Sequence, residues 1–249
     1  MSSKVRSYLQ ARAATALHHR TRLFQLLGCA ALVLSAAVAS HAQFTPVRPA
    51  TQVLDASALK PPAGVRVAIV EFDDLECPAC AHANPLLKAA AAKYNIPWIR
   101  HDLLIPSHTW SRSAAIKARW FDTRSLALGG EYRDEVFANQ PYIYNLDMLR
   151  QFTDKFAQNH GITMPAVVDP QGKFEAAVLA DTDLGRRTGV HFTPTIFIVT
   201  SGSRGPAFVE VTNPDQNLNQ IIEEALANTR PAAPPAKSTG KSTGKSTHP

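Results

Sequence analysis

Two cysteines separated by two residues, Cys77 and Cys80, stand between a stretch typical of a β-strand and one typical of an α-helix. Residues 65–72 alternate apolar positions and are rich in β-branched side chains, which predicts a strand. Residues 81–94 carry apolar side chains at helical spacing, which predicts a helix. The first sulfur therefore lies beside the unsatisfied N–H groups at a helix N-terminus, where the helix dipole favours the reactive thiolate. This is a suitable position for a dithiol redox site.

The first 42 residues are typical of a cleaved signal peptide. They contain five basic residues and no acidic one, followed by an apolar stretch over 23–39. Ser40-His41-Ala42 resembles a small-residue cleavage site. The apolar stretch is slightly short for a membrane span, although an uncleaved anchor or lipidation at Cys29 are alternatives. We therefore expect a periplasmic or otherwise extracytoplasmic protein, and favour membrane anchoring less.

Cysteine count and charge narrow the function classes further. Removal of the signal peptide leaves two cysteines, and both belong to the motif, so the chain is not a scaffold held together by many disulfides. The whole chain has a formal net charge of +6, but residues 43–229 hold 17 basic and 20 acidic side chains. The excess of positive charge lies in the two ends. We therefore expect no nucleic-acid partner.

The composition divides the rest of the chain into three parts. Residues 43–63 are rich in Pro and Ala and are predicted to form a linker, whereas residues 230–249, with Lys-Ser-Thr repeats, are predicted to form a disordered tail. A single domain over 64–229 lies between them. Beyond the first strand and helix, the predicted elements are strands at 96–105, 195–200 and 207–212, and helices at 110–121, 132–139, 146–159, 174–189 and 217–228.

This order of elements, with Cys-x-x-Cys after the first core strand and Thr193-Pro194 before a later one, resembles the thioredoxin superfamily. Within it, the chain is most similar to the DsbA-like branch, in which a helical block is inserted between the second and third core strands. The motifs that carry the resemblance lie in 70–80, 132–140 and 189–198. It implies an α/β, thioredoxin-like fold: a central mixed β-sheet flanked by helices, with an inserted helical subdomain at about 107–188.

The resemblance also implies roles for residues near the cysteines. Cys77 would be the nucleophile that forms a mixed disulfide with the substrate, and Cys80 would resolve it. Pro194 matches the family's cis-proline, and with Thr193 it would shape the edge that binds the substrate chain. An ordinary trans proline at a strand start is the alternative.

One acidic residue matches a further position of the family. Glu71 lies six positions before Cys77, where relatives carry a buried acid that relays a proton to the resolving cysteine. The alternative is a strand carboxylate that faces water. We expect Asp73, Asp74 and Glu76 to form a solvated loop edge.

The chain departs from typical DsbA proteins at two places. Pro78 and Ala79, expected to contact the substrate, stand between the cysteines where DsbA has Pro-His, and Thr193 replaces a valine. Without a cationic side chain at position 79, the Cys77 thiolate loses one source of stabilisation, which makes the disulfide a weaker oxidant. We expect a reduction potential displaced from the DsbA value of about −120 mV toward the thioredoxin value of about −270 mV. Oxidant and reductant both remain open.

The sequence thus predicts a thiol–disulfide oxidoreductase whose redox centre is the Cys77–Cys80 pair, with no metal or other cofactor. Its expected partners are cysteine-containing exported proteins and a membrane redox partner that re-oxidises or re-reduces it. Only about 22 mature residues precede the domain, too few for a dimerisation domain, so we expect a monomer.

Two alternatives come from other functional classes. One is a non-catalytic peptide-binding module on the same fold. The other is a zinc-binding module, in which the two cysteines and His82 are joined by His101 or His108, although no second paired motif completes the usual four ligands.

Overall fold

The computed structural model describes residues 49–202 and 204–229. These residues belong to the unit Arg48–Pro249. The predicted signal peptide (1–42), the first residues of the predicted linker and the predicted tail (230–249) lie outside the described residues.

A mixed sheet of four strands forms the centre of this unit. The strands are β1 (Val67–Asp73), β2 (Trp98–Asp102), β3 (Thr195–Thr200) and β4 (Phe208–Glu210), in the order β2-β1-β3-β4. β1 pairs with β2 in parallel and with β3 antiparallel, and β4 pairs antiparallel with β3. In this register Glu71 of β1 lies opposite Arg100 of β2 and Ile196 of β3. The predicted mixed sheet is confirmed.

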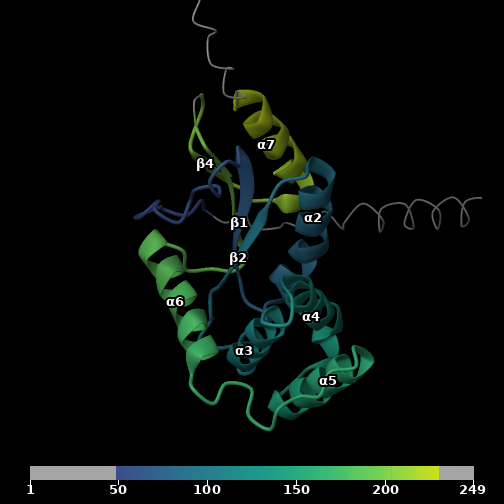
Figure 1. The fold of residues 1–249 in the computed structure, drawn as a ribbon. Coiled ribbons are helices and arrows are strands. Elements are labelled where there is room, and N and C mark those ends of the chain that lie inside the picture. Colours follow the sequence, from purple (N-terminus) through teal and green to yellow (C-terminus); the bar gives the residue numbers. More distant parts are fainter. Residues whose placement is uncertain (1–48, 203, 230–249) are drawn as a thin grey trace, which may run out of the picture. The chain divides into compact units, whose positions relative to one another are not determined.

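Helices cover both faces of the sheet (Figure 1). Because successive side chains of a strand point to opposite faces, Val67 and Ile69 pack with α2 (Pro78–Tyr94) and α7 (Pro214–Asn228). Val70 and Phe72 lie in the core of the other face, which α6 (Lys173–Thr188) covers. All seven residues of β1 are buried, as expected for a central strand between two layers.

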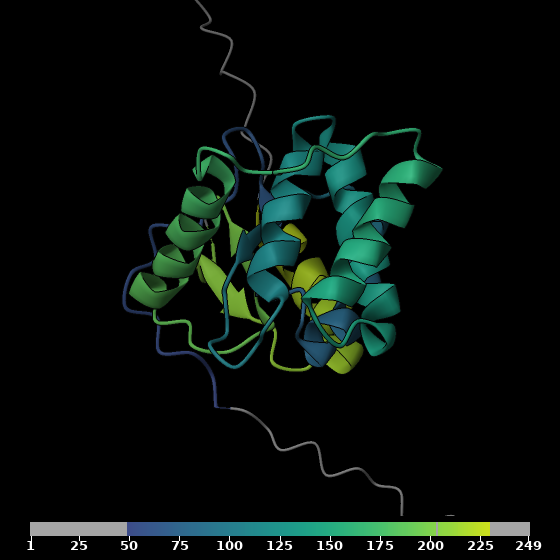
Figure 2. The same ribbon diagram turned by 90° about the horizontal axis from the view of Figure 1, so that it is seen from below.

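The helical block lies between β2 and α6. It consists of α3 (Ser111–Asp122), α4 (Leu126–Asn139), the 3₁₀ turn η1 (Gln140–Tyr142) and α5 (Leu146–Asn159). Figure 2 shows α3, α4 and α5 gathered together beside the sheet. Their shared core is rich in aromatic side chains and also includes the two cysteines. The main aromatic members are Trp110, Trp120, Phe121, Tyr132, Phe137 and Phe156.

The second helix of this block is longer than predicted. The apolar pattern predicts a start at Tyr132, whereas α4 begins at Leu126. Gly129 and Gly130 are poor helix formers, so the sequence pattern alone does not predict a helix over 126–131. The Ser125 hydroxyl provides the missing start signal, because it accepts a hydrogen bond from the Leu128 N–H.

The described part of the predicted linker lies against the domain. Residues 49–66 contain no helix or strand, but Leu59 is only 2% exposed and belongs to the core on the α6 face of the sheet. The Leu54 N–H donates to the Thr188 carbonyl at 2.9 Å, and the Thr51 hydroxyl donates to Glu210 at 3.0 Å. The Pro- and Ala-rich composition does not prevent this packing, because a single buried leucine and a few hydrogen bonds hold the segment.

Candidate active site

The two cysteines occupy different environments at the start of α2. Cys77 is the residue before the helix, and Pro78 is its first residue, where a missing N–H leaves nothing unsatisfied. Both cysteines are free thiols. Cys77 is 8% exposed and Cys80 is fully buried, whereas Pro78 and Ala79 between them are exposed. The turn therefore presents its two central residues and the edge of Cys77 to the surface.

Thr193 and Pro194 lie beside the first sulfur. The Thr193–Pro194 peptide bond is cis, as expected from the sequence. The Cys77 Sγ lies 3.3 Å from the Thr193 carbonyl oxygen, and the thiol donates to it. The fold thus brings together two motifs that stand 116 residues apart in the sequence.

The environment pushes the pKa values of the two thiols apart. A hydrogen bond from the Cys80 thiol, assisted by the Thr193 side chain and by the backbone N–H groups of Cys80 and Ala79, lowers the pKa of Cys77 to about 6, against the opposing effect of burial. Burial, together with the charge and hydrogen bond of Cys77, raises the pKa of Cys80 well above its ordinary value. At neutral pH the pair therefore consists of a Cys77 thiolate and a protonated Cys80.

Glu71 is buried in the central strand β1. It is 1% exposed, which excludes the alternative of a carboxylate facing water. The Trp98 indole N–H donates to Glu71 Oε2 at 2.9 Å, while Oε1 has no hydrogen-bond partner among the described residues. Burial and the neighbouring Asp73 charge raise the pKa of Glu71 to about 8, although Arg100 acts in the opposite direction.

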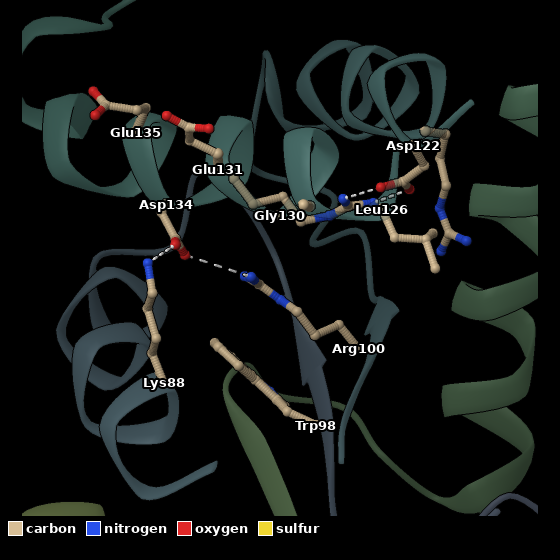
Figure 3. A pocket seen from close by; sticks show the side chains of 12 residues that line it. Lys88, Trp98, Arg100, Asp122, Leu126, Gly130, Glu131, Asp134 and Glu135 are labelled. Atoms are coloured by element: carbon tan, nitrogen blue, oxygen red, sulfur yellow. Dashed lines mark hydrogen bonds and ion pairs between the residues drawn. The ribbon is translucent and has the colours of Figure 1, made fainter. Parts of the chain in front are cut away.

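Two neighbours of Glu71, Trp98 and Arg100, line a surface pocket. Arg100 Nη2 donates to Asp73 at 2.7 Å, and its guanidinium lies 4.5 Å from the centre of the Trp98 ring. Both side chains line a pocket of about 830 Å³ between α2, β2, α3 and α4, where Arg100 points toward Asp134 (Figure 3). The residues that contact Glu71 thus connect it to a surface pocket.

The acidic residues around the first cysteine are not a solvated loop edge, and that prediction is wrong. Asp73 and Asp74 are each 2% exposed. Asp73 pairs with Arg100, and the Asp74 carboxylate accepts the N–H of Ile105 at 2.9 Å. Glu76 accepts two backbone N–H groups at the start of α3, at 2.6 and 3.0 Å. Their partners lie some 27 to 35 residues further along the chain, so local sequence gives no sign of them.

Gln140 is a site residue to which the sequence assigned no role. Its side-chain amide donates to the Leu75 carbonyl at 2.8 Å and to the Cys77 carbonyl at 3.1 Å. The residue lay within a stretch that carries the family resemblance, but nothing in the sequence pointed to these two contacts. A pocket of about 380 Å³ adjoins it, lined by Glu76, Pro78, Trp110, Gln140, Pro141, Ile143 and Tyr144.

The histidines named as alternative zinc ligands do not gather around the cysteines. Each lies 2.9 to 3.0 Å from a different carboxylate: His82 from Asp215, His101 from Asp181 and His108 from Asp74. Over 49–202 and 204–229, no group of three or more His, Cys, Asp or Glu side chains is placed to hold a metal ion. None of the helices within these ranges is long and apolar enough to cross a bilayer.

Comparison with known proteins establishes the family. The model of the Thioredoxin family (Thioredoxin_4) matches residues 64–206, which is more than half of the chain. The chain belongs to the thioredoxin family. This thioredoxin-family chain is also similar to solved structures of DsbA-like proteins, which confirms the predicted DsbA-like fold with a helical insertion.

Three such structures illustrate the likeness. A periplasmic thioredoxin-like protein from Salmonella enterica serovar Typhimurium is 21% identical with a TM-score of 0.53, covering 66% of this chain and 87% of its own. Wolbachia pipientis α-DsbA1 is 14% identical with a TM-score of 0.55, covering 72% and 93%. ScsC from Proteus mirabilis, in a transitional conformation, is 16% identical with a TM-score of 0.54, covering 92% and 100%. At these identities the comparisons establish the fold.

A curated relative shares only part of its length with this thioredoxin-family chain. The Na(+)/H(+) antiporter NhaA 3 of Salinispora tropica is 24% identical over 178 residues, which is 71% of this chain. The chain spans about a quarter (26%) of the length of that relative. The match therefore concerns one part of the antiporter protein.

Proposed function

We propose that the chain is a protein thiol–disulfide oxidoreductase that exchanges its Cys77–Cys80 disulfide with cysteines of exported proteins. The observation that carries this proposal is the asymmetry of the pair. Cys77 has a lowered pKa of about 6 and lies at the surface end of the turn, whereas Cys80 is fully buried with a raised pKa. One sulfur is thus suited to attack and leave, and the other to resolve.

The exchange needs no atoms beyond the sulfurs and protons of the two partners. When the chain acts as oxidant, a substrate thiolate attacks Cys77 Sγ, and the Cys77–Cys80 bond breaks. Cys80 leaves as a thiolate and takes up a proton, and a mixed disulfide now joins Cys77 to the substrate. A second substrate thiolate attacks the substrate sulfur and releases the Cys77 thiolate. Two electrons pass from the substrate dithiol to the Cys77–Cys80 pair.

The reverse sequence makes the chain a reductant. The Cys77 thiolate attacks a substrate disulfide, and Cys80 then loses its proton and displaces the substrate. The lowered pKa of Cys77, about 6, lies between the values of about 7 for thioredoxin and about 3.5 for DsbA. We expect the reduction potential also to lie between those of thioredoxin and DsbA. A membrane redox partner would then decide whether the chain oxidises or reduces its substrates.

We propose Glu71 as the proton relay for Cys80. Its carboxyl is buried, its pKa is raised to about 8, and its negative charge contributes to the raised pKa of Cys80. A group that binds a proton near neutral pH can deliver it to the leaving Cys80 thiolate and accept it back. No metal or other cofactor is required for this chemistry.

Four residues around Cys77, two of them exposed and two half-buried, are proposed to bind the substrate chain. Thr193 and Pro194 lie beside the sulfur, and Pro78 and Ala79 form the adjoining surface of the turn. An extended polypeptide with its cysteine at Cys77 would meet backbone groups at Thr193. Taking these residues together with the signal peptide predicted from the sequence, we propose a periplasmic or otherwise extracytoplasmic enzyme that acts as a monomer on exported proteins, not on nucleic acid.

A trapping experiment tests the proposed activity. A Cys80→Ser variant lacks the resolving thiol, so its mixed disulfide with a disulfide-containing unfolded protein should accumulate and be visible on a non-reducing gel. The Cys77→Ser/Cys80→Ser variant is the matched control and should form no adduct. Equal adduct formation by both variants, or none by either, would exclude the proposed exchange and favour a peptide-binding module.

A further inference from the structure

The loop that carries Cys77 is held from two sides. On the inner side, the Asp74 carbonyl accepts the Cys77 N–H at 2.9 Å, and the Asp74 carboxylate accepts the Glu76 N–H at 2.8 Å. On the outer side, the Gln140 side chain donates to the carbonyls of Leu75 and Cys77. The two contacts of Gln140 bracket the last turn of backbone before α2.

The Cys77 carbonyl is the acceptor on which the geometry of the turn depends. It accepts the backbone N–H groups of Cys80 and Ala81, each at 3.1 Å, and the Gln140 amide at the same distance. These bonds fix the orientation of the Cys77 peptide group relative to the first turn of α2. The N–H groups of Ala79 and Cys80, which stabilise the Cys77 thiolate, belong to that turn. A change in the peptide orientation would therefore move the sulfur relative to its donors.

Gln140 is itself firmly placed. It is the first residue of η1, directly after α4, and Pro141 restricts the backbone that follows. α4 is joined to α2 through Asn84, whose amide donates to Asp134 at 2.9 Å. The amide of Gln140 thus reaches the cysteine loop from an element that is anchored on the same helix as the cysteines.

We propose that Gln140 is a positioning residue through which the helical insertion sets the reactivity of Cys77. Its two hydrogen bonds hold the loop so that the N–H groups at the start of α2 point at the sulfur. Loss of the donor loosens the turn, weakens the stabilisation of the thiolate and makes the disulfide a weaker oxidant. The expected effect on oxidising strength rests on the proposed thiol–disulfide exchange. The expected effect on the pKa of Cys77 does not depend on it.

Two variants distinguish the loss of the hydrogen-bond donor from the introduction of a negative charge. Gln140→Met keeps the length of the side chain and removes the donor, and Gln140→Glu is isosteric and replaces the donor by an acceptor. Gln151→Met, at an exposed position of α5, is the matched control. The Cys77 thiolate is titrated by its ultraviolet absorbance in the reduced proteins, and each disulfide is equilibrated with glutathione. Thermal unfolding is followed in parallel.

Both Gln140 variants should raise the pKa of Cys77, and Gln140→Glu more than Gln140→Met. The acid dissociation constant of the thiol and the equilibrium constant for oxidation of glutathione should each fall by about threefold to tenfold, as expected for loss of one hydrogen bond. Gln151→Met should match the wild type. If Gln140→Met does not fold, Gln140→Leu decides, because it also removes the donor and adds no charge.

A purely structural role for Gln140 gives a different result. Variants that unfold at lower temperature while Cys77 titrates as in the wild type would overturn the inference. The absence of any couple with glutathione in the wild type would instead argue against the proposed function. Because the thiolate titration needs no redox couple, the two failures are distinguishable.

Discussion

At the scale of single residues, two cysteines three positions apart lie in very different environments. Cys77 lies where backbone N–H groups converge at a helix start, and Cys80 lies one turn further in, sealed by the core of the helical block. The same three-residue step along the chain therefore lowers the pKa of one thiol and raises that of the other. This division of roles follows from the hydrogen bond between the two thiols, the helix start and the deeper burial of Cys80.

The thiolate should be directly observable in the reduced protein. We expect its ultraviolet absorbance to appear with a midpoint near pH 6, as the pKa of Cys77 is lowered to about 6. Because an unfolded thiol has a pKa of about 8.5, the thiolate stabilises the reduced fold fully above that pH, and this stabilisation is lost as the pH falls through 6. Cys77→Ser should abolish the transition. A midpoint above pH 8 would contradict the assignment.

Glu71 should make stability depend on pH in the opposite sense. Its pKa is raised to about 8 from about 4.3 in an unfolded chain, so the folded state is favoured most below pH 4 and loses stability as the pH rises toward 8. Glu71→Gln removes the charge and should be the more stable protein at pH 8, by on the order of a few kcal/mol. At about pH 4 the two proteins should differ little.

Urea unfolding at both pH values measures this effect. Glu175→Gln, at a half-exposed position in the first turn of α6, is a suitable control and should show no comparable gain at pH 8. An equal difference between wild type and Glu71→Gln at both pH values would show that Glu71 does not titrate as described.

At the scale of elements, the bounds of a helix or strand can be predicted where the residues of that segment alone carry the signal. Strand β3 and helix α5 have the bounds that their patterns predict, because β-branched runs and amphipathic spacing are local signals. The acidic loop was predicted wrongly because the partners of Asp74 and Glu76 come from the segment around 105–111. Whether a charged side chain is buried depends on what the tertiary fold places opposite it.

The segment before β1 provides an element-scale test. Leu59→Ala should lower the free energy of unfolding by about 2 to 5 kcal/mol, since it removes a buried side chain from the core under the sheet. Leu54→Ala, in the same segment but with 69% of Leu54 exposed, is the matched control and should cost much less. Equal effects in urea unfolding would mean that the segment behaves as the solvated linker that its composition suggests.

At the scale of the whole molecule, the site forms where the sheet, its first helix and the helical insertion meet. Cys77 contacts Thr193, 116 residues away, and Gln140, 63 residues away. The first contact was predictable because both partners carry recognisable motifs. The second was not, because a glutamine at the end of a helix has no distinctive signal and acts through two backbone carbonyls. The sequence thus indicates the reacting atoms better than the groups that position them.

The reduction potential of the Cys77–Cys80 pair tests the central claim most directly. The purified chain would be equilibrated with mixtures of reduced and oxidised glutathione, with Cys77→Ser as the blank. We expect a reversible two-electron couple that Cys77→Ser lacks, with a potential between about −270 mV and about −120 mV. A chain with no reversible couple, or a Cys77→Ser variant that behaves like the wild type, would contradict it.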